Sequence, residues 1–224
     1  MRLPELYLVT SNEGKWREVR RELEGTAEVK WLRRKYPEIQ TGDLKEVLAF
    51  GLPHLYRELL KEGFPPSPLF ADDSGLFIDA LGGFPGVYSS FVERTIGLRG
   101  ILKLMEGVEE RGAEFRCVIG LLLPGEGGSY RMEFFQGSSR GVISTEERGY
   151  DGFGYDPIFV PFCDNPEGLT FAEMSTEEKN RRSHRGEALR EMRKYIIREL
   201  HKHLSASVRQ NLNTEAQMKR NEEE

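Results

Sequence analysis

The opening of the chain places a short apolar run directly before a segment with helical periodicity. The run ELYLV is followed by a polar turn, and then Trp16, Val19 and Leu23 recur at intervals of three or four residues before Gly25. A short apolar run predicts a strand, and the intervals after it predict an amphipathic helix. A strand that passes straight into a helix is typical of an α/β fold, so we expect a sheet with helices packed on it.

Strand patterns recur along the chain. We predict strands at AEVKWL and LFADD, and a loop-rich surface in SGLFIDALGGFPGVYSS, which is dense in glycine and aromatic residues. The runs EFRCVIGLLLPG and YRMEFFQGSSRGVIS are joined around residues 125–128 and predict an antiparallel hairpin that extends the sheet. The predicted fold class is therefore α/β, with a central mixed β-sheet flanked by helices.

Further helices are predicted between and after these strands. One begins at Asp43, with Glu46 in the position of a capping box, and Pro53 is expected to kink or divide it. A short helix covers RGILKLMEGV. The last helix carries an apolar stripe formed by Leu189, Met192, Ile196, Leu200 and Leu204.

Chain length limits the domain organisation. A chain of 224 residues makes one ordinary domain or two small lobes around a continuous core. We predict a single two-lobed domain over residues 1–204. Residues 205–224 contain no aromatic side chain and few aliphatic ones, so we expect a frayed helix or a disordered tail there.

Charge and hydropathy argue against several classes of protein. Lys and Arg number 32 against 37 Asp and Glu, which gives a net charge of −5, whereas a protein that grips a nucleic-acid backbone normally has a basic excess. No apolar run reaches the roughly 18 residues of a membrane span, and the start lacks the apolar core of a secretory signal. We therefore expect a cytoplasmic protein that binds neither nucleic acid nor membranes.

Residue types that bind transition metals are sparse. Cys117 and Cys163 are expected to remain thiols inside a cell, and the four histidines are too scattered for a cysteine and histidine cluster. Any metal would be held by carboxylates, which favours Mg²⁺, with Mn²⁺ as a substitute.

The first segment that could carry chemistry lies where the opening strand becomes a helix. Unpaired backbone N–H groups and the positive end of the helix dipole meet there and favour a bound phosphate. Hydroxyls, a glycine and a lysine complete this segment, which consists of Thr10, Ser11, Asn12, Glu13, Gly14 and Lys15. An ordinary helix cap with an exposed lysine is the alternative. A Walker A loop is excluded because GxxxxGK[ST] is absent.

Paired carboxylates lie at the end of the run LFADD. Adjacent side chains of a strand point to opposite faces, so Asp72 and Asp73 should not share one role. One of them could ligate Mg²⁺ on a triphosphate and accept a proton from an attacking water. An Asp-Ser-Gly turn, in which aspartate bonds its own backbone, is the alternative.

Two later segments could hold a nucleobase. In GFGYDP, flanking glycines leave the ring of Phe153 open for stacking, and Asp156 could accept from a base or sugar. Lys179 could neutralise phosphate, while His184 and Arg185 could donate to a purine. The alternatives are a glycine-rich turn with a core phenylalanine and an exposed, charged helix start. The phosphate segment, the paired carboxylates and these two segments each follow a predicted strand or helix. Together they indicate a nucleoside triphosphate site between two lobes.

At these positions the chain resembles the inosine triphosphate pyrophosphatases, house-cleaning enzymes for non-standard purine nucleoside triphosphates. The resemblance covers residues 1–204 and rests on strings that occur in one order: TSNEGK, YPEIQ, DDSGLFIDALGGFPGVYSS, FRCVIG, GFGYDPIF and FAEMSTEEKNRRSHRG. The strings YPEIQ and TIGLRGILKLMEG are most similar to the archaeal branch.

The resemblance implies Mg²⁺-dependent hydrolysis of ITP, dITP and XTP to the monophosphate and pyrophosphate. It implies a homodimer of elongated, two-lobed protomers with a cleft between the lobes. Asp73 would be a metal ligand and the proton acceptor, Glu38 the second metal ligand, and Lys15 a further catalytic residue. The substrate contacts it implies are Thr10 to Lys15, Ser74, Phe153, Gly154, Tyr155, Asp156, Lys179, His184 and Arg185.

Two other activities stay open at this point. A Maf-like pyrophosphatase would prefer pyrimidine or modified nucleotides, and a non-catalytic protein would bind a nucleotide without turnover. The chain also departs from the archaeal pattern: Asp72 stands where Glu is common, the segment 52–68 is longer, and residues after Leu204 have no counterpart. These departures affect the expected dimer contacts and the tail, and they leave the chemistry intact.

Overall fold

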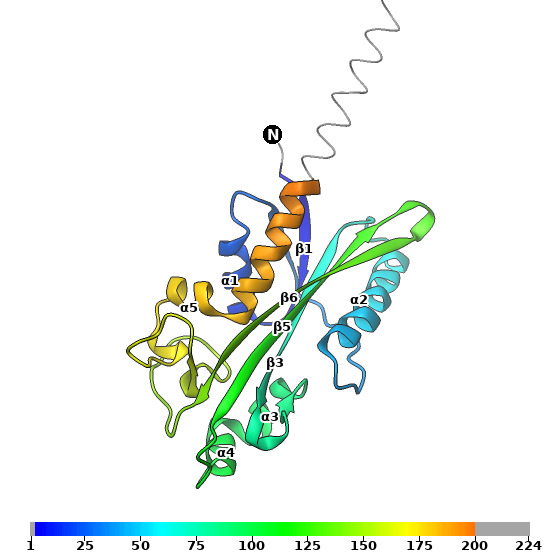
Figure 1. Cartoon of the computed structure of the whole chain (residues 1–224). Helices are drawn as coiled ribbons and strands as arrows, with labels where there is room; N and C mark the ends of the chain where they lie inside the picture. The colour runs from blue at the N-terminus through cyan, green and yellow to red at the C-terminus, as the bar shows by residue number, and fades with distance from the viewer. Residues whose placement is uncertain (1–2, 200–224) are drawn as a thin grey trace, which may run out of the picture.

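The computed structural model describes residues 3–199, which form an elongated molecule around one long, twisted sheet (Figure 1). The strand order is β2-β1-β3-β5-β6-β7, with β4 paired to β3. β1 is parallel to both of its neighbours, and the pairs from β3 to β7 are antiparallel, so the sheet is mixed as predicted. The strands are β1 (Glu5–Val9), β2 (Glu28–Leu32), β3 (Leu69–Ile78), β4 (Pro85–Gly86), β5 (Gly112–Pro124), β6 (Tyr130–Ile143) and β7 (Phe159–Pro161).

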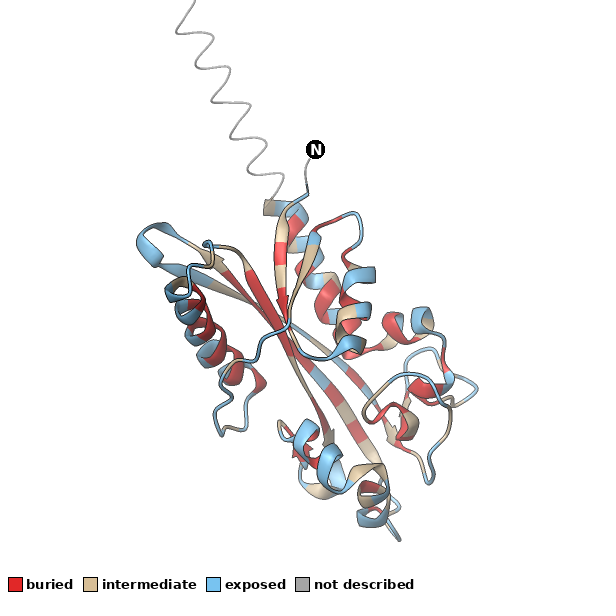
Figure 2. Ribbon diagram, turned by 180° about the vertical axis from the view of Figure 1, so that it is seen from behind, coloured by how far each residue is buried: buried red, intermediate tan, exposed pale blue. Residues whose placement is uncertain are grey.

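Helices cover both faces of the sheet, which confirms the predicted fold class (Figures 1 and 2). α1 (Glu13–Glu22) and a final helix that includes residues 184–199 lie on one face, and α2 (Leu44–Lys61) lies on the other. The remaining helices are α3 (Ser89–Thr95), α4 (Gly97–Leu104) and α5 (Thr176–Arg182).

Three buried clusters divide the molecule into two lobes joined by the long strands β3, β5 and β6. Two clusters lie on opposite sheet faces, one under α1 and the final helix around Val19 and Met192, the other under α2 around Leu48. The third lies where α3, α4 and β7 meet, around Phe159. Each fully buried side chain of this size contributes about 1.5–3 kcal/mol, so both ends have a core of their own. We call them the helical lobe (α1, α2, final helix) and the distal lobe (α3, α4, β7).

The predicted loop-rich surface after Asp73 is partly wrong, because β3 continues to Ile78. Every residue of β3 pairs with β5, and Leu76 and Ile78 are buried in the distal lobe. A complete ladder and two buried side chains outweigh the turn preference of Ser74-Gly75, which local composition alone suggests.

The predicted division of α2 at Pro53 and the predicted capping box at Glu46 are both wrong. α2 is a single helix from Leu44 to Lys61 that Pro53 does not divide, because its buried side chains anchor both halves on the sheet. Asp43 caps the helix by accepting from the Lys45 N–H at 2.7 Å. Glu46 bonds the Thr41 hydroxyl instead of closing a capping box.

Other local predictions are confirmed. The β5–β6 hairpin turns through a short 3₁₀ helix at Glu126–Gly128, and the predicted short helix corresponds to α4, which begins slightly earlier. Of the final stripe, Leu189, Met192 and Ile196 are buried, while Leu200, Leu204 and the predicted tail lie outside the described residues. No helix within residues 3–199 has both the length and the apolar character needed to span a membrane.

Candidate active site

A cleft of about 440 Å³ opens between the two lobes, next to the carboxyl ends of β1 and β2. Open α/β sheets commonly bind ligands at this end of their parallel strands. Among the predicted site residues, Glu13 and Gly14 do not line the cleft. Those that do are Thr10, Ser11, Asn12, Lys15, Glu38, Asp73, Ser74, Phe153, Gly154, Tyr155, Asp156, Lys179, His184 and Arg185.

The segment between β1 and α1 is held by short-range hydrogen bonds. The Asn12 side chain caps α1 by accepting from the Lys15 N–H at 3.1 Å, and Thr10 Oγ1 accepts from the Asn12 N–H at 3.1 Å. The Trp31 indole of β2 donates to the Thr10 carbonyl at 2.8 Å. Glu13 forms an ion pair along its own helix. This arrangement presents the positive end of α1 to the cleft, as an anion site requires.

Gly14 allows a close contact between the start of α1 and the loop that carries Phe153. A Cβ atom at this position would lie 2.7 Å from Cδ1 of Phe153. Glycine therefore allows the Phe153 ring to pack against the first turn of α1. The predicted phosphate segment and the predicted base platform are in direct contact as a result.

Asp72 and Asp73 point to opposite sides of β3, as strand geometry requires. Asp72 Oδ2 accepts from Lys15 Nζ at 3.1 Å and from Arg185 Nε at 3.0 Å. Asp73 lies near Glu38 on the other side, and its pKa is raised to about 6, first by burial and further by the charges of Asp72 and Glu38, against an opposing effect of Lys15. Asp73 is thus a carboxylate whose negative charge is incompletely matched.

Asp73 and Glu38 fit a hard divalent cation that also binds substrate. Within residues 3–199 there is no group of three or more His, Cys, Asp and Glu side chains arranged to hold a metal unaided. Mg²⁺ commonly takes one or two carboxylates and completes its shell with water and substrate phosphate. The raised pKa of Asp73 shows that a positive charge there would be favourable. Two carboxylates without a third ligand therefore suit Mg²⁺ bound together with a polyphosphate.

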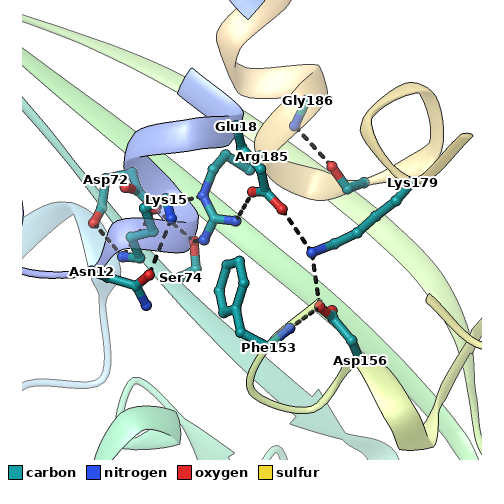
Figure 3. A network of polar contacts seen from close by, with 11 residues as sticks. Asn12, Lys15, Glu18, Asp72, Ser74, Phe153, Asp156, Lys179, Arg185 and Gly186 are labelled. Carbon is teal, nitrogen blue, oxygen red and sulfur yellow. Dashed lines mark hydrogen bonds and ion pairs between the residues drawn. The ribbon is translucent and has the colours of Figure 1, made fainter. Parts of the chain in front are cut away.

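A buried chain of alternating charges connects residues that line the cleft (Figure 3). Arg185 donates to Asp72 at 3.0 Å and to Glu18 at 2.6 Å, and Lys179 donates to Glu18 at 2.7 Å and to Asp156 at 2.8 Å. None of these side chains is more than 8% exposed. Removing one member of such a pair typically costs about 3–5 kcal/mol, because it leaves a buried charge unmatched. Lys179 and Arg185 are therefore already neutralised by the protein.

The loop of residues 152–156 forms one wall of the cleft. Lys179 Nζ lies 4.4 Å and Arg185 Cζ 5.4 Å from the centre of the Phe153 ring, and the Phe153 N–H donates to Asp156 at 2.7 Å. The Tyr155 hydroxyl donates to the Ser89 carbonyl at 2.8 Å, which ties this loop to α3. Phe153 is thus a ring of fixed orientation, backed by cations, of a kind that can stack on a nucleobase.

His184 is a buried imidazole at the edge of the cleft. Its ring stacks on Phe115 with centroids 4.5 Å apart. Burial and the nearby Arg185 and Lys179 charges hold the pKa of His184 well below its usual range, so the ring is neutral. Its Nδ1 atom has no hydrogen-bond partner in the described part of the chain. A neutral imidazole with an unsatisfied nitrogen is suited to bind a ligand atom.

Comparison with known proteins shows the family of this chain. The model of the Ham1 family matches residues 6–195. The chain belongs to the Ham1 family. It is 50% identical over 195 residues to the dITP/XTP pyrophosphatase of Pyrococcus horikoshii, covering 85% of this chain and 96% of the relative. It is 48% identical over 194 residues to the Thermococcus kodakarensis protein of that name, with coverage of 85% and 96%.

A solved Ham1 structure has the same fold. The HAM1 protein from Coxiella burnetii superposes with a TM-score of 0.70 at 30% identity, over 88% of this chain and 100% of that one. Together with the family match, this similarity confirms the family predicted from the sequence.

Sequence reasoning misses Glu18, which joins two cations that line the cleft, Lys179 and Arg185. Glu18 lies on α1, three residues after Lys15, where a glutamate is ordinarily solvated. Its partners Lys179 and Arg185 are 161 and 167 residues away in sequence. The one local signal is its spacing of three from Lys15, which places both on one helix face.

Gly51 is the second residue that the sequence leaves unnoticed. A Cβ atom at this position in α2 would clash with the Tyr36 ring and lie 2.8 Å from the Pro37 carbonyl oxygen. Glycine therefore lets the loop that carries Glu38 rest directly on α2. A glycine inside a helix costs about 1 kcal/mol relative to alanine, and that cost was the available signal of a close approach.

Proposed function

We propose that this protein hydrolyses the non-standard purine nucleoside triphosphates ITP, dITP and XTP to the monophosphate and pyrophosphate. The observation that carries the proposal is that one cleft combines a helix N-terminus, the Asp73 and Glu38 carboxylates, and a neutral His184 beside Phe153. Relatives named dITP/XTP pyrophosphatase, of which this chain covers 96%, support the same substrate class.

At the phosphate end, the protein binds and orients the reacting groups. Backbone N–H groups at the start of α1 and the Lys15 ammonium bind phosphate oxygens. Asp73 and Glu38 would hold Mg²⁺, which would polarise the phosphate and offset the charge of the leaving pyrophosphate. Asp73, ionised above a pKa of about 6, accepts a proton from the water that attacks the α-phosphorus. Positioning and electrostatics then supply most of the acceleration.

At the base end, the protein selects a 6-keto purine. His184 and Arg185 present N–H donors, which match a keto oxygen and conflict with the amino group of ATP. One unmatched buried donor costs about 1–3 kcal/mol, enough to disfavour ATP by roughly tenfold or more. Stacking on Phe153 is compatible with any purine and contributes affinity without selectivity.

The proposed enzyme uses a divalent metal and works as a dimer in the cytoplasm. Mg²⁺ is the proposed metal, with Mn²⁺ as its substitute, because two carboxylates and a polyphosphate are hard oxygen ligands. We also propose a cytoplasmic homodimer of single-domain protomers, in line with the family resemblance. The net charge of −5 favours a small-molecule partner over nucleic acid.

Product analysis tests the proposed function. Purified protein with Mg²⁺ is incubated with ITP, dITP, XTP, ATP, GTP and a pyrimidine triphosphate, and the products are identified. The expected products from ITP are IMP and pyrophosphate. Release of IDP and phosphate would indicate a different enzyme. A preference for pyrimidines would favour a Maf-like activity, and binding without turnover would favour a nucleotide sensor.

A further inference from the structure

Three of the cations that line the cleft are already paired inside the protein. Lys15, Lys179 and Arg185 contact the carboxylates of Asp72, Glu18 and Asp156, so three positive charges match three negative ones. The side chains of these cations are also at most 20% exposed. The buried network therefore leaves no net positive charge for a polyphosphate.

Two further carboxylates at the phosphate end make the net charge of the cleft negative. Asp73 and Glu38 add two negative charges to the cleft, and a single divalent cation offsets only those two. A triphosphate carries several negative charges of its own near neutral pH, so it needs further cations beyond Lys15. The other cations that line the cleft are Arg34, Lys35 and Arg94.

Arg34 and Lys35 lie on the loop that follows β2 and line the cleft from there. Lys35 is exposed, and its ammonium makes no ion pair or hydrogen bond with any side chain or carbonyl in residues 3–199. Arg34 pairs with Glu62, but the two side chains are 49% and 52% exposed. Such surface pairs contribute about 0–1 kcal/mol, so phosphate oxygens can replace Glu62 at little cost.

The strand order indicates how a bound nucleotide would be oriented in the cleft. β1 lies between β2 and β3, so the loop with Arg34 and Lys35 is on the far side of the β1–α1 segment from β5 and β6. The Phe153 ring packs on Gly14 and lies beside Lys179 and Arg185, and Arg185 pairs with Asp72. Asp73 lies instead near Glu38, three residues after Lys35. A nucleotide with its base on Phe153 and its α-phosphorus beside Asp73 directs its outer phosphates toward Arg34 and Lys35.

We propose that Arg34 and Lys35 form a binding subsite for the β- and γ-phosphates and hold the pyrophosphate product before its release. The inference rests on the proposed function and adds the residues that recognise the leaving group. It predicts that pyrophosphate binding depends on these two cations and that monophosphate binding does not.

The test compares two variants of the full chain. One is the double variant Arg34→Gln, Lys35→Gln. The matched control is Arg33→Gln, because Arg33 has the same charge on the same loop, lies 3.9 Å over the Trp31 ring, and does not line the cleft. Calorimetric titration with pyrophosphate and with IMP, both in Mg²⁺, measures binding without turnover. Steady-state assays with ITP then give KM and kcat.

We expect the double variant to bind pyrophosphate roughly tenfold more weakly, because two charge-assisted contacts are lost in a partly exposed site. KM for ITP should rise more than kcat falls, while IMP binding and all properties of Arg33→Gln stay near wild type. Unchanged pyrophosphate binding in the double variant, or an equal loss in Arg33→Gln, would overturn the subsite. Failure of the wild type to release pyrophosphate from ITP would instead overturn the proposed function, since the titrations need no turnover.

Discussion

At the scale of single residues, the cleft gives adjacent carboxylates opposite properties. Burial opposes the ionisation of Asp72, yet the Lys15 ammonium and the Arg185 guanidinium hold its pKa well below its usual range. Asp73, one residue later, has a pKa raised to about 6 by burial and by neighbouring carboxylates. Asp72 is therefore a permanent anion of the buried network, and Asp73 is the carboxylate that can exchange a proton near neutral pH.

The raised pKa of Asp73 predicts a pH-dependent requirement for metal. Below a pKa of about 6, protons compete with the cation for this carboxylate. At subsaturating Mg²⁺, kcat/KM for ITP should fall about tenfold per pH unit below that pKa and level off above it. The measurement is a pH profile of ITP hydrolysis at several Mg²⁺ concentrations. A profile that stays flat across the pKa of Asp73 would contradict its role.

Replacement of Asp73 provides the control for that profile. Asp73→Asn should lose most of its turnover and retain nucleotide binding, because an amide neither accepts the proton nor binds Mg²⁺ as strongly. Near-normal turnover of this variant with Mg²⁺ would remove Asp73 from the mechanism.

His184 allows a test of base selection that leaves the ion network in place. In His184→Ala, the ratio of kcat/KM for ITP over ATP should fall about tenfold, since one matched buried hydrogen bond contributes about 1–3 kcal/mol. The neutral ring forms no ion pair, so the charges of Arg185 and Lys179 stay matched. Equal losses for ITP and ATP would count against base reading by His184.

At the scale of elements, contacts between loops and helices position the site. The loop with Glu38 rests on α2 through Gly51, and the loop with Phe153 rests on α1 through Gly14. The hydroxyl of Tyr155 ties the second loop to α3 in the distal lobe. The proposed metal ligand Glu38 and the proposed base platform Phe153 are thus each held by a different helix.

The Gly51 contact predicts a specific effect on metal binding. Gly51→Ala forces the Tyr36 ring and the Pro37 carbonyl to move and shifts Glu38 with them. The Mg²⁺ concentration for half-maximal activity should rise about tenfold. Loss of a residue that orients a metal ligand typically lowers metal affinity by at least this factor. Gly42→Ala is the control, because a Cβ there meets nothing within 4 Å. If both variants need the same Mg²⁺ as wild type, the contact does not position Glu38.

At the scale of the whole molecule, the ion network joins segments that are far apart in the chain. It connects α1, β3, the loop before β7, α5 and the final helix, and therefore links the active-site cleft to the core of the helical lobe. Some side chains that line the cleft consequently also contribute to stability.

Asp73 lowers the stability of the metal-free protein, because its pKa is higher in the folded state. The unfolded chain ionises near 3.8, so the free energy of unfolding falls as pH rises from there to about 6 and stays reduced above it. This shift corresponds to a penalty of roughly 3 kcal/mol at most. Asp73→Asn should therefore be more stable than wild type at neutral pH without metal. Urea unfolding measures the difference, and a less stable variant would refute the assignment.

Local sequence is sufficient to predict much of this molecule. The strand-to-helix opening, the hairpin and the carboxylates of β3 all follow from spacing over a few residues, and so does the segment from Thr10 to Lys15. The extent of β3 is not predicted, because the ladder with β5 overrides the turn preference of Ser74-Gly75. Glu38 entered the prediction through resemblance alone, since an isolated loop glutamate carries no local signal.

Sequence by itself determined which elements form and which residue types occur beside the strand ends, because hydrophobic periodicity and turn chemistry act over short distances. Tertiary structure alone decided which charges neutralise one another and which remain available to a ligand. Glu18 is buried because Lys179 and Arg185 reach it from the other end of the chain, and Asp73 has a raised pKa because the fold places Glu38 and Asp72 near it. Burial and Coulomb interactions depend on distance in space, which separation in the chain does not give.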